Sequence, residues 1–463
     1  MKITFFGAAG GVTGTAYYCE SSDASILIDC GMFQGGKDAE IMNKEAPPVN
    51  YNTLDAIVLT HAHLDHCGRL PLAVREGYRG PVFGTPATID LSALVLRDSL
   101  KVQTSDLEKR NRMRVRKGKQ KVEMTFDEAD VEGAIRQMKP LSYHKPFTVA
   151  PGMEIIVDEA GHILGSGSLK LTVNEGNRRK SVIFSGDLGG QGMPIVRDSE
   201  PFKEADMVIM ESTYGDRDHK PLQETIDEAI GIIKEALHSK GKILVPSFAI
   251  GRTQDLIYYI EQAFRQGGLP RFPIYIDSPM AIEATRIYMS HPELFDDDMK
   301  EFIRSGEMER DKGYIRPTST AEESKHLNEV QGPCMIIAGS GMCNAGRIKH
   351  HLRHNLWKPE TSVLIVGYQA EGTLGRRLVN GDQSVNIFGE RIVVRAKIHK
   401  LGGFSAHAGQ TDLINWFNAL APDRPRVVLT HGEEKSRIPI AEIIQHRYGL
   451  QPFLPEYGES IEL

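Results

Sequence analysis

Short runs of apolar residues, each closed by polar residues, recur along the first two hundred or so residues. Their composition and length predict β-strands. The runs are Ile26–Ile28, Ala56–Leu59, Glu154–Val157, Ser181–Phe184 and Met207–Met210. Two stretches with helical spacing of apolar residues, Ala87–Lys101 and Phe126–Met138, interrupt them. The region therefore predicts an α/β sandwich and not an all-β barrel.

From about Tyr214 the pattern changes to alternating strands and helices, which is typical of a parallel α/β domain. The expected helices are Leu222–His238 and Thr253–Gln266, and the expected strands are Lys242–Pro246, Ile274–Ile276 and Cys334–Ala338. After about Glu390 the earlier pattern returns, with strands expected at Arg391–Ile398 and Val427–Leu429 and a helix at Thr411–Leu420. We therefore expect one domain of residues 1–213 and 391–463, interrupted by an inserted domain of residues 214–390.

Length and composition agree with this division without naming a function. A chain of 463 residues exceeds what one hydrophobic core usually fills, and 40% hydrophobic with 25% charged residues is typical of globular proteins. The formal net charge of −6 means that any surface for a polyanion has to be a local patch. One such patch is Lys109–Lys121, with eight Lys or Arg and no acid. By itself a charge run of this kind favours a solvated helix end or loop, and its role stays open.

The cysteines and the N-terminus indicate the cellular compartment of the protein. Five dispersed cysteines without a CxxC pair are typical of reduced thiols. Glycines interrupt the apolar N-terminal run within seven residues, and no stretch approaches the roughly 20 apolar residues of a membrane span. We expect a cytoplasmic protein without a membrane partner.

The strongest chemical signal is the sequence HAHLDH, which follows the expected strand ending at Leu59. Its four potential ligands can converge from a turn at the end of a strand; they are His61, His63, Asp65 and His66. Imidazole and carboxylate ligands without thiolate suit a catalytic divalent metal better than a closed structural zinc site. Further ligand types occur in the same context, each after a strand-like run: His162, Asp187, Glu211 and His431. Each is weak evidence alone, because polar residues often cap strands. Together they are numerous enough to hold two metal ions.

These motifs, with Asp29 in the upstream sequence ILIDCG, resemble the successive motifs of the metallo-β-lactamase superfamily, in the same order. The resemblance implies an αββα sandwich. It also implies that His61, His63 and His162 bind one zinc ion, that Asp65, His66 and His431 bind a second, and that Asp187 bridges them. Asp29 would orient the HAHLDH loop from behind. His at position 63 favours zinc over iron, with manganese as the alternative metal.

Three more segments are similar to motifs A, B and C of the β-CASP nucleases: Glu211–Gly215, Gly403–His407 and Leu429–Glu433. The resemblance implies a parallel α/β β-CASP domain inserted between motifs A and B, which agrees with the change of pattern at about Tyr214. His431 in motif C favours RNA over DNA as substrate, since DNA-repair members have Val there. Glu211 and His407 are implied as catalytic residues beside Asp65, with His407 as a proton donor or as a structural partner of Glu211.

Glycine-rich segments of the inserted domain are similar to β-CASP segments that line the substrate cleft. They lie at Pro246–Arg252, Gly339–Arg347 and Gly367–Arg377. Glycine permits close approach to phosphate, and the nearby hydroxyl and guanidinium groups can bind it. The candidate phosphate ligands are Ser247, Arg252, Ser340, Arg347 and Arg376.

The combined hypothesis is a two-zinc endoribonuclease that cuts single-stranded RNA. A hydroxide bridging the metals would attack phosphorus and leave a 5′ phosphate and a 3′ hydroxyl. The alternatives are a 5′-to-3′ exoribonuclease, a small-molecule metallohydrolase and an RNA-binding scaffold with an inactive site. A homodimer remains an alternative to a monomer.

Overall fold

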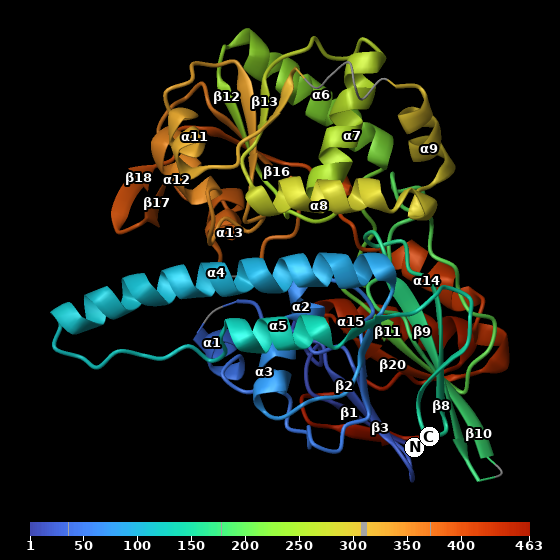
Figure 1. The fold of residues 1–463 in the computed structure, drawn as a ribbon. Coiled ribbons are helices and arrows are strands. Elements are labelled where there is room, and N and C mark those ends of the chain that lie inside the picture. The colour runs from blue at the N-terminus through green and yellow to red at the C-terminus, as the bar shows by residue number, and fades with distance from the viewer. Residues whose placement is uncertain (36, 177, 307–312, 371) are drawn as a thin grey trace. The chain divides into compact units, whose positions relative to one another are not determined.

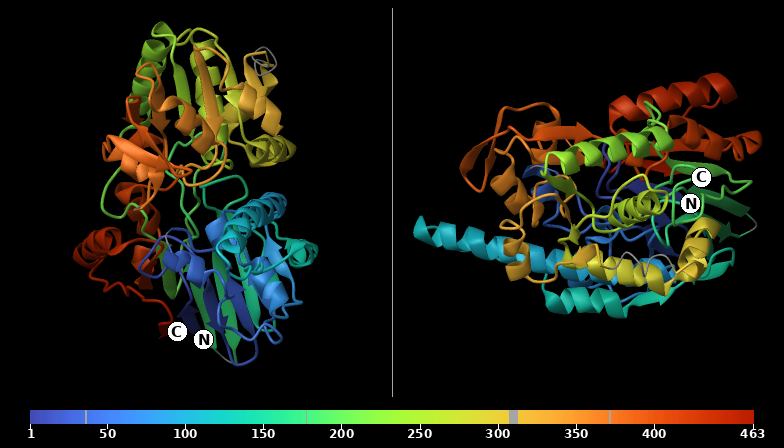
Figure 2. Two further views of the ribbon diagram at one scale, coloured as in Figure 1. Left: turned by 90° about the vertical axis from the view of Figure 1, so that its left-hand side faces the viewer. Right: turned by 90° about the horizontal axis from the view of Figure 1, so that it is seen from above.

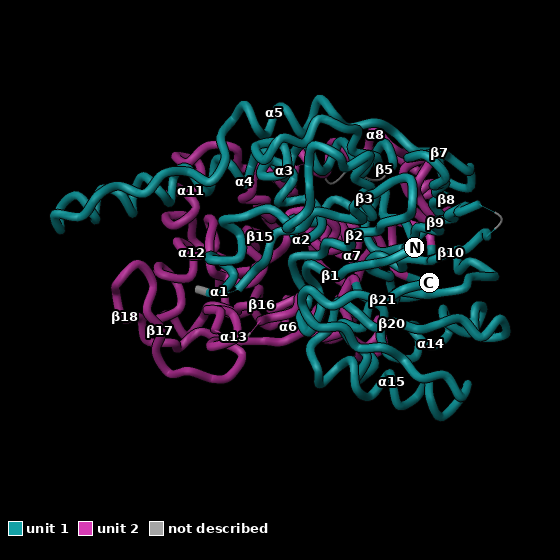
Figure 3. Tube along the Cα trace, turned by 90° about the horizontal axis from the view of Figure 1, so that it is seen from below, with its two compact units in different colours: residues 1–192, 198–218, 407–463 teal, residues 193–197, 219–406 magenta. Residues whose placement is uncertain are grey.

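The structure is a computed structural model that describes residues 1–35, 37–176, 178–306, 313–370 and 372–463. It divides into two compact units (Figure 3). Unit 1 consists of Met1–Gly192, Asp198–Asp218 and His407–Leu463, and unit 2 consists of Met193–Arg197 and His219–Ala406. Unit 2 is thus inserted into unit 1.

Unit 1 contains two sheets in its described residues. The first has the strand order β21 (Ser460–Glu462), β1 (Lys2–Phe5), β2 (Tyr17–Glu20), β3 (Ser25–Ile28), β4 (Ala56–Val58), β5 (Val82–Gly84) and β6 (Met138–Pro140). The second has the order β20 (Arg426–Thr430), β11 (Met207–Glu211), β10 (Arg178–Phe184), β9 (Gly167–Glu175), β8 (Met153–Glu159) and β7 (Phe147–Ala150). Figure 2 shows the two sheets lying face to face.

Strand β11 and the end of β10 are buried on both faces, which explains their continuous apolar sequences. In β11, Met207 and Ile209 join the core between the two sheets, whereas Val208 and Met210 join a second core with helices. In β10, Ile183 likewise points away from the core that holds Val182 and Phe184. Successive side chains of a strand point to opposite faces, so one strand serves both cores. These runs are therefore central strands of a layered structure.

Helices cover the outer face of each sheet of unit 1 (Figures 1 and 2). On the first sheet they are α1 (Lys37–Met42), α2 (Leu64–Cys67), α3 (Leu70–Arg75), α4 (Pro86–Arg116) and α5 (Glu128–Arg136). On the second they are α14 (Gln410–Asn418) and α15 (Glu434–Tyr448). Leu413 and Phe417 of α14 and Ile440 of α15 pack in the second core. The expected αββα sandwich is confirmed.

Unit 2 is built on a parallel sheet. The described strand order is β14 (Ile315–Pro317), β13 (Ile274–Ile276), β15 (Cys334–Ala338), β12 (Lys242–Pro246), β16 (Ser362–Ile365) and β19 (Lys397–Lys400), and every pairing in it is parallel. Its helices are α6 (Leu222–His238), α7 (Arg252–Arg265), α8 (Pro279–Ser290), α9 (Asp297–Arg304), α11 (Ala321–His326), α12 (Ile348–Asn355) and α13 (Leu374–Val379). Ile243 packs with α6 and α7 on one face, and Leu244 packs with α12 on the other. The inserted parallel α/β domain is confirmed.

The segment after Glu390 differs from its expected place. Arg391–Ile398 was expected to form one strand of the returning domain, but two strands cover it. β18 (Glu390–Val393) pairs with β17 (Ser384–Ile387) in a hairpin, and β19 pairs with β16 of unit 2. Because this pairing holds the segment in unit 2, the chain of the described structure returns to unit 1 at His407. It enters unit 2 briefly at Met193–Arg197 and again after Asp218.

In the part of the chain that the structure describes, no helix is both long enough and apolar enough to cross a membrane.

Candidate metal centre

The predicted ligands of unit 1 lie just beyond the ends of neighbouring strands. β3 pairs in parallel with β4, β10 with β11, and β11 with β20. Parallel strands end at the same edge of a sheet, so the residues that follow them meet there. Asp29 follows β3, His61 follows β4, Asp187 follows β10 and His431 follows β20.

Backbone conformation turns two of these residues out of their strands. Asp29 has a φ of 59° and His431 a φ of 48°, in the left-handed region that side-chain-bearing residues seldom adopt. Each is held there by a backbone hydrogen bond: the Asp29 amide donates to the carbonyl of Val58 at 2.9 Å, and the His431 amide to that of Ala8 at 2.7 Å. Such strain persists where the surrounding structure determines it, often at functional sites.

The HAHLDH loop packs directly against the chain that follows β3. A Cβ atom at Gly31 would lie 1.6 Å from the Asp65 carbonyl oxygen, so only glycine permits this approach. The amide of Cys30 donates to the carbonyl of His66 at 2.8 Å. The short helix α2 carries Asp65 and His66 immediately after His63. The loop is thereby held in place by the neighbouring strand.

Asp29 orients this loop through three hydrogen bonds. Its carboxylate accepts from the amide and the hydroxyl of Thr60, both at 2.8 Å, and from Nδ1 of His66 at 2.8 Å. Because Nδ1 of His66 donates to Asp29, the lone pair of Nε2 faces the centre of the site. Asp29 is fully buried. Its placement behind the ligands agrees with its expected role.

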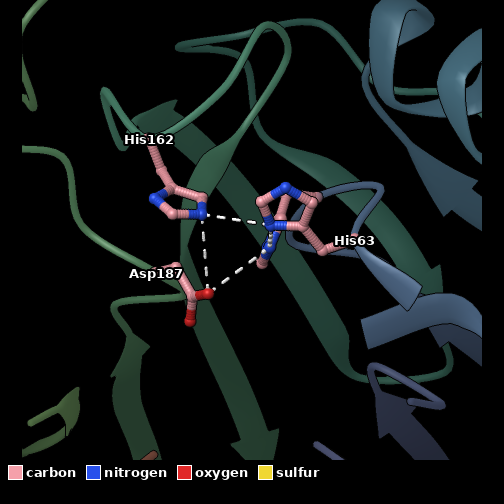
Figure 4. A group of neighbouring side chains, drawn as sticks. His63, His162 and Asp187 are labelled. Carbon is pink, nitrogen blue, oxygen red and sulfur yellow. Dashed lines mark hydrogen bonds and ion pairs between the residues drawn. The ribbon is translucent and has the colours of Figure 1, made fainter. Parts of the chain in front are cut away.

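Three imidazoles and one carboxylate form the first donor group: His61, His63, His162 and Asp187. Their ligand atoms all lie within 4.8 Å of one another. Nε2 of His61 and Nε2 of His162 lie 3.1 and 3.2 Å from Nδ1 of His63. Figure 4 shows His63 and His162 pointing toward each other beside the carboxylate of Asp187.

Asp65, His66 and His431 form a second donor group. Asp187 lies between the two groups and turns one oxygen to each. Its Oδ2 lies 3.5 Å from Nε2 of His61 and 3.7 Å from Nε2 of His162. Its Oδ1 lies 3.4 Å from Nε2 of His66 and 3.4 Å from Nδ1 of His431. The structure thus brings together all seven residues that the sequence singled out as ligands.

The donor chemistry of the site fits divalent cations. Ring nitrogens of His61, His63 and His162 converge. A neutral imidazole has one proton for its two ring nitrogens, so a lone pair as well as N–H groups points into this group. Oδ1 of Asp187 is buried and accepts no hydrogen bond from the described residues. Buried polar atoms normally have partners, and an ion is one explanation of an exception. Nitrogen and oxygen donors without sulfur are typical of catalytic zinc and of manganese.

The electrostatics favour a cation at His61, His63 and Asp187. Burial, followed by the charge of His66, lowers the pKa of His61 well below its ordinary value. Burial lowers the pKa of His63 to about 4. Burial alone would raise the pKa of Asp187, but the neighbouring His431 and His66 hold it well below its usual range. Neutral imidazole and ionised carboxylate are the forms that bind metal. At His66 burial lowers the pKa, but the carboxylates of Asp187 and Asp29 outweigh it and raise the pKa well above its ordinary value, so a metal bound there displaces a proton.

His407 lies beside the donor groups and is held by Glu211. Its Nδ1 lies 3.2 Å from Oε1 of Glu211 and 4.0 Å from Oδ2 of Asp187. Burial lowers the pKa of His407, but the charge and hydrogen bond of Glu211 outweigh this and raise it to about 9. Glu211 in turn accepts from the amides of Leu188 and Thr213 at 2.7 and 3.1 Å. The carboxylate is therefore fixed, and it holds the His407 imidazole beside the donor groups.

Several polar residues around the ligands were not singled out as candidates from the sequence. The hydroxyl of Thr60 lies 3.1 Å from Nδ1 of His61, and that of Thr213 lies 3.0 Å from Nδ1 of His431. Ser185 accepts from the amide of Glu211 at 2.9 Å. Each is adjacent in sequence to a candidate site residue or two residues from one, which is the only signal that could have identified them. The two threonine hydroxyls orient the imidazole rings, and the Ser185 hydroxyl holds the backbone at Glu211.

The candidate phosphate ligands lie in unit 2, where several make internal contacts. Arg252 is nearly fully buried and its Nη1 lies 3.0 Å from Oδ2 of Asp255. Nη1 of Arg347 donates to Asp277 at 2.7 Å and to the Thr318 carbonyl at 2.9 Å. These contacts favour a structural role for both guanidinium groups, and their phosphate binding stays a prediction.

The other three candidates differ in exposure. The hydroxyl of Ser247 is buried and accepts from Thr253 at 3.0 Å, and that of Ser340 accepts from the amide of Ala345 at 3.1 Å. Arg376 is half-buried in the last turn of α13. Their contacts with phosphate also stay predictions.

Comparison with known families identifies three segments. Residues 9–77 match the metallo-β-lactamase superfamily, residues 253–378 match the Beta-Casp domain, and residues 391–455 match the Zn-dependent metallo-hydrolase RNA specificity domain. The order of these matches along the chain is the order of the two domain types that the sequence predicted.

Whole-chain relatives agree with these matches. Ribonuclease TTHA0252 of Thermus thermophilus is 38% identical over the full length of both chains. Transcription termination factor FttA of Methanocaldococcus jannaschii is 29% identical over the whole of this chain and 72% of its own length. A protein of unknown function from Enterococcus faecalis V583 shares the fold, with a TM-score of 0.53 and 13% identity over 100% of this chain and 99% of its own. The chain therefore belongs to the β-CASP family of metal-dependent ribonucleases in the metallo-β-lactamase superfamily.

Proposed function

We propose that the chain is a zinc-dependent endoribonuclease that hydrolyses phosphodiester bonds in single-stranded RNA and leaves 5′ phosphate and 3′ hydroxyl ends. Family membership supports a metal-dependent ribonuclease. The match of residues 391–455 to an RNA specificity domain of zinc-dependent hydrolases supports RNA as the substrate and zinc as the metal.

The observation that carries this proposal is the position of Asp187 between the two donor groups. One carboxylate oxygen faces His61 and His162, and the other faces His66 and His431, at 3.4 to 3.7 Å. A carboxylate with two separate sets of imidazole neighbours suits two cations that share it as a ligand. A site for a single ion would leave one of these sets without a use.

We assign His61, His63 and His162 to one zinc ion, Asp65, His66 and His431 to the other, and Asp187 to both. Two bound ions would lower the pKa of a water molecule toward neutrality and offset charge on the phosphate. Asp29 and Thr60 keep His66 and His61 in the orientation that points their lone pairs into the site.

His407 serves as the proton donor in this proposal. Glu211 stabilises its protonated form and fixes the ring through Nδ1, and we assign to this imidazolium the proton that the departing 3′ oxygen takes up. One product then carries a 3′ hydroxyl, and the phosphate remains on the 5′ end of the other. Attack by the RNA's own 2′ hydroxyl would instead leave a cyclic phosphate.

The test uses zinc-loaded protein and a long single-stranded RNA labelled at either end. Asp65→Ala protein and a chelated sample serve as controls, and His407→Gln tests the proton donor separately. We expect internal cuts that vanish in both controls, and slower cutting by His407→Gln at unchanged zinc content, by about 10²- to 10⁴-fold.

Three results would contradict the proposal in different ways. Mononucleotides released only from the 5′ end would identify a 5′-to-3′ exonuclease. Cyclic phosphate ends would exclude the mechanism while keeping the substrate. No metal-dependent cutting of any RNA would exclude ribonuclease activity and leave a small-molecule hydrolase or an RNA-binding scaffold.

A further inference from the structure

Helix α4 is much longer than the part of it that packs. Its apolar face from Ala87 to Leu96 is buried in unit 1, including Leu91 and Val95. From Arg97 to Arg116 it has no buried residue. Figures 1 and 2 show this half of α4 extending beyond the other helices of unit 1. Helices in proteins usually owe their stability to packing of one face, so a long unpacked extension needs another explanation.

The chain returns along the extended helix and is fastened to it. The side chain of Asn111 donates to the carbonyl of Val122 and accepts from its amide, both at 2.8 Å. Nε of Arg114 donates to the carbonyl of Gln120 at 2.7 Å. The end of α4 and the segment after it therefore form one built element. We call residues 109–121 the basic arm.

The basic arm concentrates positive charge in a chain that is acidic elsewhere. It holds eight Lys or Arg and no acid, whereas the rest of the chain holds 47 Lys or Arg against 61 Asp or Glu. Lys109, Arg110 and Arg112 have carboxylates at 3.5 to 3.9 Å, all on exposed side chains. Among the described residues, no ion pair joins the other five cations, which are Arg114, Arg116, Lys117, Lys119 and Lys121. The arm thus keeps most of its charge uncompensated.

This arrangement does not serve the helix itself. Arg110 and Arg114, and likewise Arg112 and Arg116, are like charges four residues apart, which destabilises a helix by a few tenths of a kcal/mol per pair. Cations in the last turn do interact favourably with the helix dipole, but that effect is confined to the final turn. It does not account for Arg110, nor for Lys119 and Lys121 beyond the helix. An anionic partner would offset the repulsion.

We propose that the basic arm binds the phosphate backbone of RNA outside the metal centre of unit 1. The inference rests on the proposed function, because RNA is the ligand in both. Arginine and lysine clusters without acids bind nucleic-acid phosphates independently of sequence, and they do so in a strongly salt-dependent way. Exposed Met113 and Val115 lie among the cations and offer small apolar contacts to sugars or bases. The arm lengthens the stretch of RNA held by the protein and leaves the choice of the cut bond to the metal centre.

The test measures binding of a fluorescently labelled oligouridylate to the full-length chain, with Asp187→Asn present throughout so that the RNA stays uncut. The arm variant carries Arg116→Gln, Lys117→Gln, Lys119→Gln and Lys121→Gln, because the side chains of these four residues form no ion pair with the described residues. A matched control removes four exposed cations elsewhere in unit 1: Lys139→Gln, Lys145→Gln, Arg178→Gln and Lys203→Gln. A charge-preserving variant carries Lys117→Arg, Lys119→Arg and Lys121→Arg.

We expect the arm variant to raise Kd by about tenfold or more at about 0.1 M salt and to reduce the slope of log K against log salt by up to about 3, near 0.7 per lost phosphate contact. The control and the charge-preserving variant should bind as the Asp187→Asn chain does. Equal weakening by the arm and control variants would show only a general charge effect and would overturn the proposal. Weakening by the charge-preserving variant would overturn it as well.

Two further measurements separate this inference from the proposed function and from another partner. If the chain without any substitution cuts no RNA while the arm variant still loses RNA binding, the nuclease proposal fails and the arm's role stands. If the chain without any substitution cuts RNA and the arm variant binds RNA normally, only the arm proposal fails. Arm-dependent binding to phosphatidylserine vesicles, with RNA binding unchanged, would replace RNA by a membrane surface.

Discussion

Both units bury a histidine against an aspartate, and the two pairs differ in what surrounds them. In unit 1, Nδ1 of His66 lies 2.8 Å from Asp29, and its Nε2 faces Asp187 and His431 at 3.4 and 3.3 Å. In unit 2, Nε2 of His351 lies 2.6 Å from Asp277, and its Nδ1 is buried without a hydrogen-bond partner among the described residues. Both histidines are almost fully buried.

Asp277 of unit 2 and Asp187, the carboxylate between the two donor groups of unit 1, have opposite surroundings. Asp277 accepts from Ser324 at 2.6 Å, from Arg347 at 2.7 Å and from His351 at 2.6 Å, so donors satisfy both of its oxygens. Asp187 has imidazoles at 3.4 to 3.7 Å on each oxygen and no hydrogen bond to Oδ1. The same residue types therefore build a closed structural network in one unit and an open donor set in the other. Converging lone pairs, and not residue type, distinguish a metal site from a polar core.

The largest expected effect is the loss of metal binding on Asp187→Ala. Removing the ligand shared by both donor groups should reduce RNA cleavage by more than the roughly 10²- to 10⁴-fold expected from loss of one proton donor. Metal content per chain, measured by mass spectrometry of the dialysed protein, should fall with it. If Asp187→Ala kept its full metal content and cleaved RNA at the full rate, Asp187 would not be a metal ligand and the contrast with Asp277 would fail.

An intermediate effect is expected from Asp277→Ala, which should change stability and not metal content. It leaves His351 and Arg347 without their buried partner, a loss of about 3–5 kcal/mol in the stability of unit 2. Urea unfolding monitored by circular dichroism gives the free energy of unfolding, and metal content is measured on the same sample. Asp382→Ala is a suitable control, because Asp382 pairs with Arg377 at an exposed site. If Asp277→Ala releases metal while the fold is retained, the closed network of unit 2 is not merely structural.

The smallest expected effect is that of Asp29→Ala, which tests the His–Asp pair of unit 1 directly. Loss of a carboxylate that orients a ligand typically costs about 10- to 100-fold in metal affinity. Competition with a chelator of known affinity measures this change. An unchanged affinity would mean that Thr60 alone positions His66, whose Nδ1 lies 3.3 Å from its hydroxyl.

The sequence singled out residues that the structure brings together, because the signals for them are local. Apolar runs mark strands, and ligand types directly after them mark one edge of a sheet. His61, His63 and His66 are close in sequence, so a short turn can bring them together. Helix α6 and strands β12, β13 and β15 lie where the periodicity placed them, since alternation within a few residues reflects burial on one or two faces.

Expectations that depended on distant partners were less accurate. Arg391–Ile398 reads as a single strand, yet its two halves pair with β17 and β16. The contact of Arg347 with Asp277, 70 positions away, was likewise not visible in the sequence, and phosphate binding by Arg347 stays a prediction. Helix α4 was expected to end at Lys101 and continues to Arg116. Apolar periodicity stops where packing stops, although the helix itself does not.

By itself, the sequence determined the order of domains, the family and the set of ligand types, because each is encoded in short patterns. Only the tertiary structure decided which of these residues meet. His66 and His431 are 365 positions apart and follow strands of different sheets, β4 and β20, so the approach of their rings depends on how the two sheets of unit 1 pack against each other. It also separated Asp187 from Asp277, because whether a buried carboxylate faces hydrogen-bond donors or lone pairs is set by neighbours that the fold supplies.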